Sequence, residues 1–316
     1  MRRRLGAALL TGVLAGACAT PQTDSLRRQA AHTPAPPGAH AHLLTAVPFF
    51  PQERQQCGPA TLAMALGAAG VPATPEELRD LVFVPGRGGS LATEMLVAAR
   101  RRGLLALTLP PALDAVLHQV DEGHPVIVLQ NLGLWFYPVW HYALIIGYDI
   151  DRDQVVLHSG PEPRQVLSME LFERTWARSG RWAMIAVDPR RPPQSLDMAS
   201  VLEATAALER VDAGAAHAAY QALTARADAS FAAWMGLGNS AYAQGDAAAA
   251  VNAFETATRL APDRAEAWNN LAVGLLALGA PARAHAAIAH ALALGGTQLG
   301  QYEQTAREIE AATPHP

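Results

Sequence analysis

The chain has 316 residues, half of them hydrophobic, so it is long enough to form more than one domain with a buried core. Its 24 basic residues are all arginine, and the formal net charge is −4. A chain without lysine has no phosphate-binding P-loop and no Schiff-base lysine. Because no basic patch is interleaved with aromatic residues, the sequence also argues against nucleic-acid binding. It indicates no cofactor.

The N-terminal segment 1–17 has the pattern of an export signal. Three arginines precede an apolar run from Leu5 to Ala17, which is too short to remain as a membrane-spanning helix. We therefore expect this segment to be removed on export.

Cys18 follows this segment directly, and the junction resembles a bacterial lipoprotein signal, in which that cysteine is acylated. The resemblance implies a protein anchored through a lipid on Cys18 at the periplasmic side, on the outer membrane where the host has one. Ala15 stands where lipoprotein signals usually have leucine, and Ala15-Gly16-Ala17 also fits ordinary secretion. A soluble secreted form is therefore the alternative.

Residues 18–43 are rich in proline, alanine, glycine and histidine and show no core-forming periodicity. This composition predicts a flexible linker. His40 and His42 lie in it without further ligands, so we predict no metal site there.

Cys57 stands immediately before a run, Ala60–Ala69, that predicts a buried helix. Gly58 permits close backbone approach, and Pro59 suits the first helical turn. Unpaired N–H groups and the helix dipole at such a position lower the pKa of a thiol and favour the thiolate. If Cys18 carries lipid, Cys57 has no disulfide partner. The alternative is a buried structural cysteine, but its polar, glycine-flanked position favours a nucleophile.

Around this segment the sequence predicts an α+β domain over residues 44–190. A capping box at Thr74–Glu77 begins one helix, and two more are expected at 91–102 and 111–122. Short runs rich in β-branched and aromatic residues predict strands at 126–130, 141–148, 154–158 and 181–187. Helices that precede strands are typical of an antiparallel sheet packed against the cysteine helix.

His141 lies on one of these strands and is the candidate general base. A Cys–His pair supplies the nucleophile and the proton-transfer group that amide cleavage needs. The alternative is a satisfied buried histidine, and we expect that structural role for His124 and His158. An aromatic cluster just before the base either lines a cleft or packs on the sheet: Trp135, Phe136, Tyr137 and Trp140.

Two stretches, Gln52–Leu62 and Trp140–Asp149, resemble the C39-like branch of papain-fold cysteine peptidases, particularly its exported members with a tetratricopeptide tail. The resemblance implies that Cys57 is the nucleophile, His141 the general base and acid, and Gln52 the oxyanion donor. Such relatives cut after paired glycines in leader peptides and are often fused to an ATP-driven exporter. It therefore implies peptide cleavage after small residues such as Gly-Gly, with any transporter a separate chain.

The chain departs from that family in two places. The family's glutamine usually lies six residues before the cysteine, whereas Gln52 lies five before it and Gln55 and Gln56 compete for the role. The family orients its histidine with Asp or Asn, where this chain has Ser159, which can accept a hydrogen bond but carries no charge. A catalytically weak or inactive peptide-binding adaptor is therefore one alternative. An acyltransferase or isopeptidase is another.

Residues 191–312 are alanine-rich and repeat with a period of 34, as in the pairs Trp234/Trp268 and Gly245/Gly279. This period and its residue pattern predict an all-α tetratricopeptide solenoid with a degenerate first copy over 196–229. Such solenoids present a groove to a peptide or protein partner. The alternative is that the repeats only support or dimerise the catalytic domain.

Overall fold

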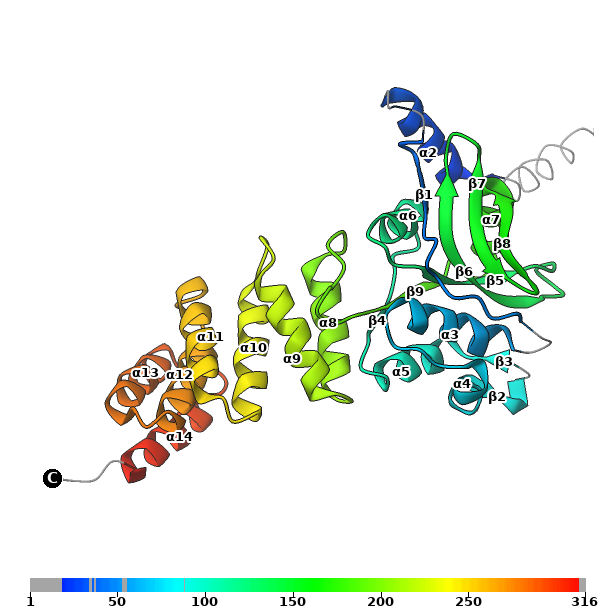
Figure 1. The fold of residues 1–316 in the computed structure, drawn as a ribbon. Helices are drawn as coiled ribbons and strands as arrows, with labels where there is room; N and C mark the ends of the chain where they lie inside the picture. The colour runs from blue at the N-terminus through cyan, green and yellow to red at the C-terminus, as the bar shows by residue number, and fades with distance from the viewer. Residues whose placement is uncertain (1–18, 34–35, 37, 53–55, 88, 313–316) are drawn as a thin grey trace, which may run out of the picture. The chain divides into compact units, whose positions relative to one another are not determined.

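The computed structural model describes residues 19–33, 36, 38–52, 56–87 and 89–312 (Figure 1). The chain divides into two compact units, and the change from one to the other falls between Asp188 and Asp197. The predicted signal segment and Cys18 lie outside the described residues. None of the described helices is both long and apolar enough to cross a membrane.

The N-terminal unit is built on a seven-stranded antiparallel sheet with the strand order β4-β9-β5-β6-β7-β8, in which β1 also pairs with β6. Four of its strands coincide with the predicted ones within a few residues. The strands are β1 (Ala41–Leu43), β4 (Leu105–Thr108), β5 (Val126–Asn131), β6 (Trp140–Asp149), β7 (Gln154–Ser159), β8 (Glu162–Ser168) and β9 (Ala183–Val187).

Three helices cover one face of this sheet: α3 (Cys57–Ala68), α4 (Pro75–Val82) and α5 (Ala92–Arg100). Nine residues of α3 are buried, so no stripe of α3 faces water. Side chains alternate along β6, and Tyr142, Leu144 and Ile146 join the core beneath α3. The predicted capping box is confirmed: Thr74 and Glu77 exchange side-chain-to-backbone hydrogen bonds at the start of α4. Between α4 and α5, the short strands β2 (Phe83–Val84) and β3 (Gly89–Ser90) pair across the 3-10 turn η1 (Pro85–Arg87).

The opposite face of the sheet packs against α6 (Leu113–Asp121) and α7 (Met169–Ala177). Phe172 and Trp176 of α7 are fully buried, and their rings stack. Gln130 of β5 donates to Thr175 of α7 at 2.7 Å, which shows that Gln130 faces α7. Because His141 is the cross-strand partner of Gln130, its side chain begins on this same face.

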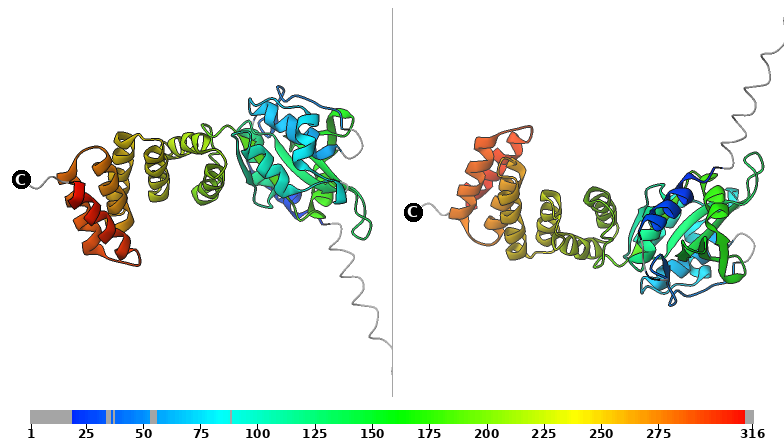
Figure 2. Two further views of the ribbon diagram at one scale, coloured as in Figure 1. Left: turned by 90° about the horizontal axis from the view of Figure 1, so that it is seen from below. Right: turned by 90° about the horizontal axis from the view of Figure 1, so that it is seen from above.

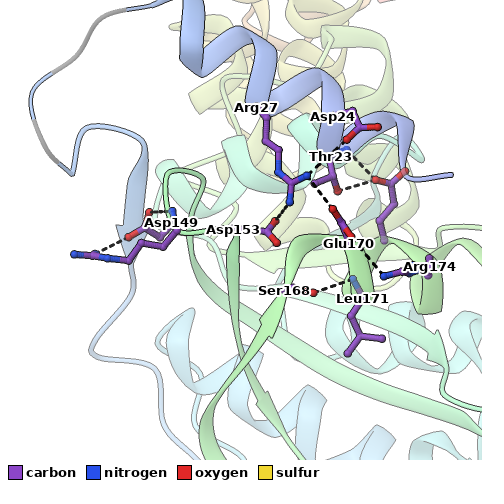
Figure 3. Close-up of polar contacts among 11 residues, drawn as sticks. Thr23, Asp24, Arg27, Asp149, Asp153, Ser168, Glu170, Leu171 and Arg174 are labelled. Carbon is purple, nitrogen blue, oxygen red and sulfur yellow. Dashed lines mark hydrogen bonds and ion pairs between the residues drawn. The ribbon is translucent and has the colours of Figure 1, made fainter. Parts of the chain in front are cut away.

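The predicted flexible linker over 18–43 is wrong for its described parts Pro21–His32 and Ala41–Leu43, which form a helix and a strand. Residues Pro21–His32 form helix α2, which lies against the surface of the N-terminal unit (Figure 2). The buried carboxylate of Glu173 accepts hydrogen bonds from the backbone N–H groups of Gln22 and Thr23 and from the Thr23 hydroxyl. Arg27 contacts both Glu170 and Asp153 (Figure 3). Helix α2 is therefore held in place by polar contacts with residues far away in the sequence, which the composition of the segment itself does not indicate.

The end of the same segment is also ordered. Ala41–Leu43 form β1, which pairs with Gly147–Asp149 of β6. His40 lies 3.1 Å from Asp151 and His42 lies 3.6 Å from Asp121, both through Nδ1. No group of three or more potential metal ligands occurs among the described residues.

The C-terminal unit is a series of antiparallel helix pairs. The first helices of successive pairs begin at 198, 231 and 265, and a final helix begins at 299, which follows the predicted period and includes the degenerate first copy. The helices are α8 (Met198–Glu209), α9 (Ala213–Thr224), α10 (Phe231–Ala243), α11 (Ala247–Leu260), α12 (Ala265–Ala277), α13 (Pro281–Leu294) and α14 (Leu299–Ala312). Gly238 lets the Phe254 ring pack on the α10 backbone, because a Cβ there would lie 2.4 Å from a ring carbon.

Candidate active site

Cys57 is the first residue of α3 and is half-buried. The preceding residue, Gln56, provides no side-chain cap for the helix. The N-terminal N–H groups of α3 are thus not satisfied by a capping side chain, and the helix dipole favours negative charge at this point. The position suits both a thiolate and an oxyanion.

His141 is oriented by Ser159. Its ring Nε2 lies 2.9 Å from Ser159 Oγ, and the buried Ser159 ends strand β7. Burial lowers the pKa of His141 below its ordinary value of 6.5, so the ring is neutral at neutral pH. When Nε2–H donates to Ser159, the lone pair of a proton-accepting ring remains on Nδ1.

Gln52 connects the cysteine helix to the end of β7. Its amide nitrogen donates to Thr61 Oγ1 at 2.8 Å, and its amide oxygen accepts from the backbone N–H of Gly160 at 3.0 Å. Its own backbone N–H donates to the Gly160 carbonyl at 3.0 Å. Thr61 lies one helical turn after Cys57, on the same face of α3, and Gly160 follows Ser159. Gln52 thus links the neighbourhoods of nucleophile and base.

Helix α3 and strand β6 are also joined at the backbone carbonyl of Tyr142. It accepts from Thr61 Oγ1 at 3.3 Å and lies 3.4 Å from the Gln52 amide nitrogen. Burial, and after it the neighbouring Cys57, raises the pKa of the Tyr142 hydroxyl. Cys57 is therefore close to the residue that follows His141. Among the described residues, however, no hydrogen bond joins Cys57 to His141.

One polar residue near Cys57, Ser90, was not expected from the sequence. Its carbonyl accepts from the hydroxyl of Tyr142 at 3.3 Å. The Ser90 side chain lies against Gly58, where an added Cβ would lie 2.1 Å from Ser90 Oγ. This buried hydroxyl has no partner among the described residues. Only the proximity of Ser90 to the first turn of α3, which is a tertiary contact, identifies it as part of the site.

His158 has a structural environment. Its Nδ1 accepts from the Arg164 backbone N–H at 3.2 Å, its Nε2 lies 3.5 Å from the Val47 carbonyl, and its ring contacts Phe49 edge-on. These contacts fix the neutral ring with the proton on Nε2. His124, also expected to be structural, donates from Nδ1 to the side-chain oxygen of Gln119 at 3.3 Å.

A cavity of about 460 Å³ opens beside the His141–Ser159 pair, on the α7 side of the sheet. Its wall combines leucine side chains with polar groups, so it suits one side chain or turn of a peptide. It is lined by Gln130, Leu132, His141, Ser159, Gly160, Pro161, Glu162, Gln165, Leu167, Leu171 and Thr175.

The aromatic cluster before the base does not pack on the sheet. Trp135 is 83% exposed, Phe136 64%, Tyr137 74% and Trp140 54%. Trp135, Phe136 and Tyr137 belong to the turn between β5 and β6, and Trp140 is the first residue of β6. Of the two roles considered for them, packing on the sheet is wrong.

The C-terminal unit has its own cavity, of about 570 Å³. Three asparagines line it, and Asn270 donates to Asn239 at 2.9 Å. Side-chain amides of this kind can donate to and accept from a peptide main chain. The cavity is lined by Asn239, Tyr242, Phe254, Asn269, Asn270, Val273, Gln301, Gln304, Thr305 and Glu308.

The N-terminal unit combines a cysteine at a helix N-terminus with an antiparallel sheet in which strand β6 carries an imidazole at its second residue, an arrangement typical of an α+β domain of the cysteine-peptidase type. Comparison with known families agrees: residues 44–184 match the Peptidase C39 like family, and residues 201–251 and 236–298 match the tetratricopeptide repeat. The N-terminal domain therefore belongs to the C39-like peptidase family, and the C-terminal domain is a tetratricopeptide-repeat domain. No curated protein matches the chain.

Among solved structures, the chain is similar to a protein described as a C39-like peptidase from Bacillus anthracis, with 19% identity, a TM-score of 0.41, and coverage of 46% of this chain and 97% of that one. It is also similar to the peptidase domain of Streptococcus ComA, a bifunctional ABC transporter of a quorum-sensing pathway, with 23% identity, a TM-score of 0.38 and coverage of 45% and 98%. A third is a double-glycine-motif protease from an AMS/PCAT transporter in complex with the leader peptide, with 24% identity, a TM-score of 0.35 and coverage of 46% and 96%.

Proposed function

We propose that this protein is a cysteine peptidase in which Cys57 attacks a peptide carbonyl and His141 transfers the protons. The observation that carries the proposal is the hydrogen-bonded connection from His141 through Ser159 and Gly160 to Gln52 and Thr61, one turn from Cys57. This connection holds the strand of the base against the helix of the nucleophile.

The reaction proceeds in two stages. His141 Nδ1 takes the thiol proton, Cys57 Sγ bonds to the carbonyl carbon, and the same nitrogen returns the proton to the leaving amine as the C–N bond breaks. Water then hydrolyses the thioester and restores the thiol. The N–H groups at the start of α3 and the Gln52 amide are the candidate oxyanion donors. Cleavage after small residues such as Gly-Gly belongs to the same proposal.

A peptide-binding adaptor without peptidase activity is the second candidate. Two observations favour it: Ser159 has no charge with which to stabilise an imidazolium, and no hydrogen bond joins Cys57 to His141 among the described residues. An acyltransferase or isopeptidase would use the same groups on another amide.

The repeats and the N-terminus extend the proposal. The amide-lined cavity of the C-terminal unit would hold a peptide segment of a protein partner, and a lipid on Cys18 would hold the protein at the periplasmic side of a membrane. Any transporter that delivers its substrate would be a separate chain.

The test is thiol reactivity combined with product analysis. At neutral pH, iodoacetamide should alkylate Cys57 at a rate that falls about tenfold or more in His141→Ala, because a base increases the thiolate fraction. His118→Ala, a variant on α6, serves as the matched control. A peptide panel that includes Gly-Gly sequences should yield hydrolysis products, and added amines would reveal acyl transfer. Labelling that ignores His141, together with intact peptides that still bind, would replace the peptidase with the adaptor.

A further inference from the structure

The turn between β5 and β6 together with the first residue of β6, residues 132–140, forms a projecting loop that we call the aromatic hairpin. All of its side chains beyond Gly133 are exposed, and Trp135 at its tip is 83% exposed. Soluble proteins rarely expose so many contiguous apolar side chains without a binding role. Only Leu132 lines the cavity beside His141, so the tip is convex and lies outside the proposed peptide site.

The aromatic hairpin has a defined shape. The buried Asn131 accepts from the backbone N–H groups of Gly133 and Val139 at 3.0 and 2.9 Å through its side-chain oxygen. Leu134 and Tyr137 exchange backbone hydrogen bonds across the tip. Arg178, just after α7, donates to the Gly133 carbonyl at 2.8 Å. The apolar side chains are therefore displayed on a fixed frame.

Its chemistry matches a lipid surface. No acidic or basic residue other than histidine occurs between Glu122 and Asp149. The paired backbone groups at Leu134 and Tyr137 need no water, as a low-dielectric environment requires. Tryptophan and tyrosine are the side chains that favour the membrane–water interface, and the guanidinium of Arg178, at the base of the hairpin, is a group that pairs with lipid phosphates.

The start of α2 points toward the same end of the N-terminal unit. Thr23 contacts Glu173, whereas Arg27 contacts Glu170, so α2 runs antiparallel to α7 (Figure 3). Pro21 therefore lies toward the C-terminal end of α7, where Arg178 bonds to the aromatic hairpin. A membrane attachment through the chain before Pro21 and one through the hairpin would engage the same surface.

We propose that the aromatic hairpin inserts its tip into the interfacial region of a lipid bilayer. The hairpin contacts the membrane by burying Trp135 and Phe136 among the headgroups and upper acyl chains. The insertion does not depend on a lipid on Cys18 or on peptidase activity.

The test uses the chain from residue 18 onward, as expected after export, with Cys18→Ser so that it cannot be acylated, and phosphatidylcholine vesicles with and without phosphatidylglycerol. We expect the protein to sediment with the vesicles and its tryptophan emission to shift to shorter wavelength. Adding Trp135→Ala and Phe136→Ser should reduce the partition coefficient at least about tenfold, because each change removes a large apolar side chain from the interface. The melting temperature should not change, since both side chains are exposed.

The matched control replaces two other exposed apolar residues, Leu260→Ser and Leu278→Ser, on the C-terminal unit. Those changes should leave vesicle binding unchanged. Equal loss in both variants, or no vesicle binding by the parent, would overturn the proposal. The proposal would also be overturned if the hairpin variant bound vesicles normally but had a raised KM for peptides, because the hairpin would then bind a peptide. It would equally be overturned if the variant bound vesicles normally but lost a concentration-dependent dimer, because the hairpin would then bind a second copy of the chain.

Discussion

Ser159 Oγ lies 2.9 Å from Nε2 of His141, so an uncharged hydroxyl orients the proposed base. The hydrogen bond can hold the ring with Nδ1 free to accept a proton. It cannot supply the charge that would stabilise an imidazolium during the reaction. The site is therefore arranged to orient the imidazole but only weakly to stabilise its charged form.

The first prediction concerns this positioning residue. Ser159→Ala should lower kcat/KM about fivefold with little change in KM, because one neutral hydrogen bond is worth about 1 kcal/mol. Ser159→Asp should raise kcat and move the acidic limb of its pH profile upward, since a carboxylate stabilises the protonated ring. Peptide hydrolysis across a pH series measures both. Unchanged activity in Ser159→Ala would mean that another group orients His141.

Gln52 can be tested for its two roles separately. Gln52→Ala removes the amide, whereas Thr61→Val removes only the hydroxyl to which the amide donates at 2.8 Å. If Gln52 is an oxyanion donor, its loss should lower kcat about 10²-fold or more beyond the effect of Thr61→Val. If it only connects α3 to Gly160, the two variants should lose stability and activity in parallel, and steady-state kinetics with urea unfolding would distinguish these outcomes.

Acidification should destabilise the protein through two buried histidines. Burial lowers the pKa of both His141 and His158 below the ordinary 6.5. The unfolded chain therefore binds protons that the folded protein excludes. The contribution of the two neutral histidines to the free energy of unfolding is complete above about pH 6.5 and is lost as the pH falls from there toward their folded-state pKa values. Urea unfolding between about pH 8 and pH 5.5 should show this slope, and His158→Gln should reduce it. A free energy of unfolding that stays constant or rises as the pH falls over that range would contradict this prediction.

The helix α2 depends on one buried acid. Glu173 is 1% exposed and accepts three hydrogen bonds from Gln22 and Thr23. Glu173→Ala should detach α2 and cost about 2–3 kcal/mol, the range for hydrogen bonds to a charged group. Hydrogen exchange over Pro21–His32 should then become fast. Glu170→Ala, which removes the more exposed ion pairs with Arg27 and Arg174, should cost less than about 1 kcal/mol and leave exchange slow.

The residues that the sequence predicts well are those with local signals. The helix start at Cys57, the strand of His141 and the helical repeats each follow from a motif or a period within one segment. The contacts of α2 join residues 150 apart in the chain, and only Leu26 of its apolar side chains is buried, so no local pattern predicts them. Strand β8 was missed for a related reason: as an edge strand it is mostly exposed and includes Pro163 and Arg164.

The site shows the same division. Cys57, His141, Ser159 and Gln52 could be proposed from the sequence, because each lies in one of two motifs. Ser90 could not, since its place beside Gly58 depends on how the β2–β3 hairpin folds over α3. The exposure of Trp135 could not be predicted either, because an apolar run reads the same whether it is covered or projects beyond the sheet.

The repeat unit offers a final test of packing at a single glycine. Gly238 lies within α10, and an added Cβ would meet the Phe254 ring at 2.4 Å. Alanine is about 1 kcal/mol better than glycine in a helix, but Phe254 is 2% exposed and belongs to the core cluster of the repeats, so displacing its ring would disturb that packing. In Gly238→Ala the cost of overpacking should therefore exceed the gain in helix propensity, and the C-terminal unit should lose about 1–2 kcal/mol of its free energy of unfolding. Thermal unfolding followed by hydrogen exchange in α10 and α11 measures this loss of stability.

The control is Gly214→Ala. It lies at an exposed helical position without close neighbours other than Asp212, so the change should be neutral or stabilising. If Gly238→Ala stabilised the unit as Gly214→Ala does, the ring of Phe254 would not rest on the α10 backbone in solution.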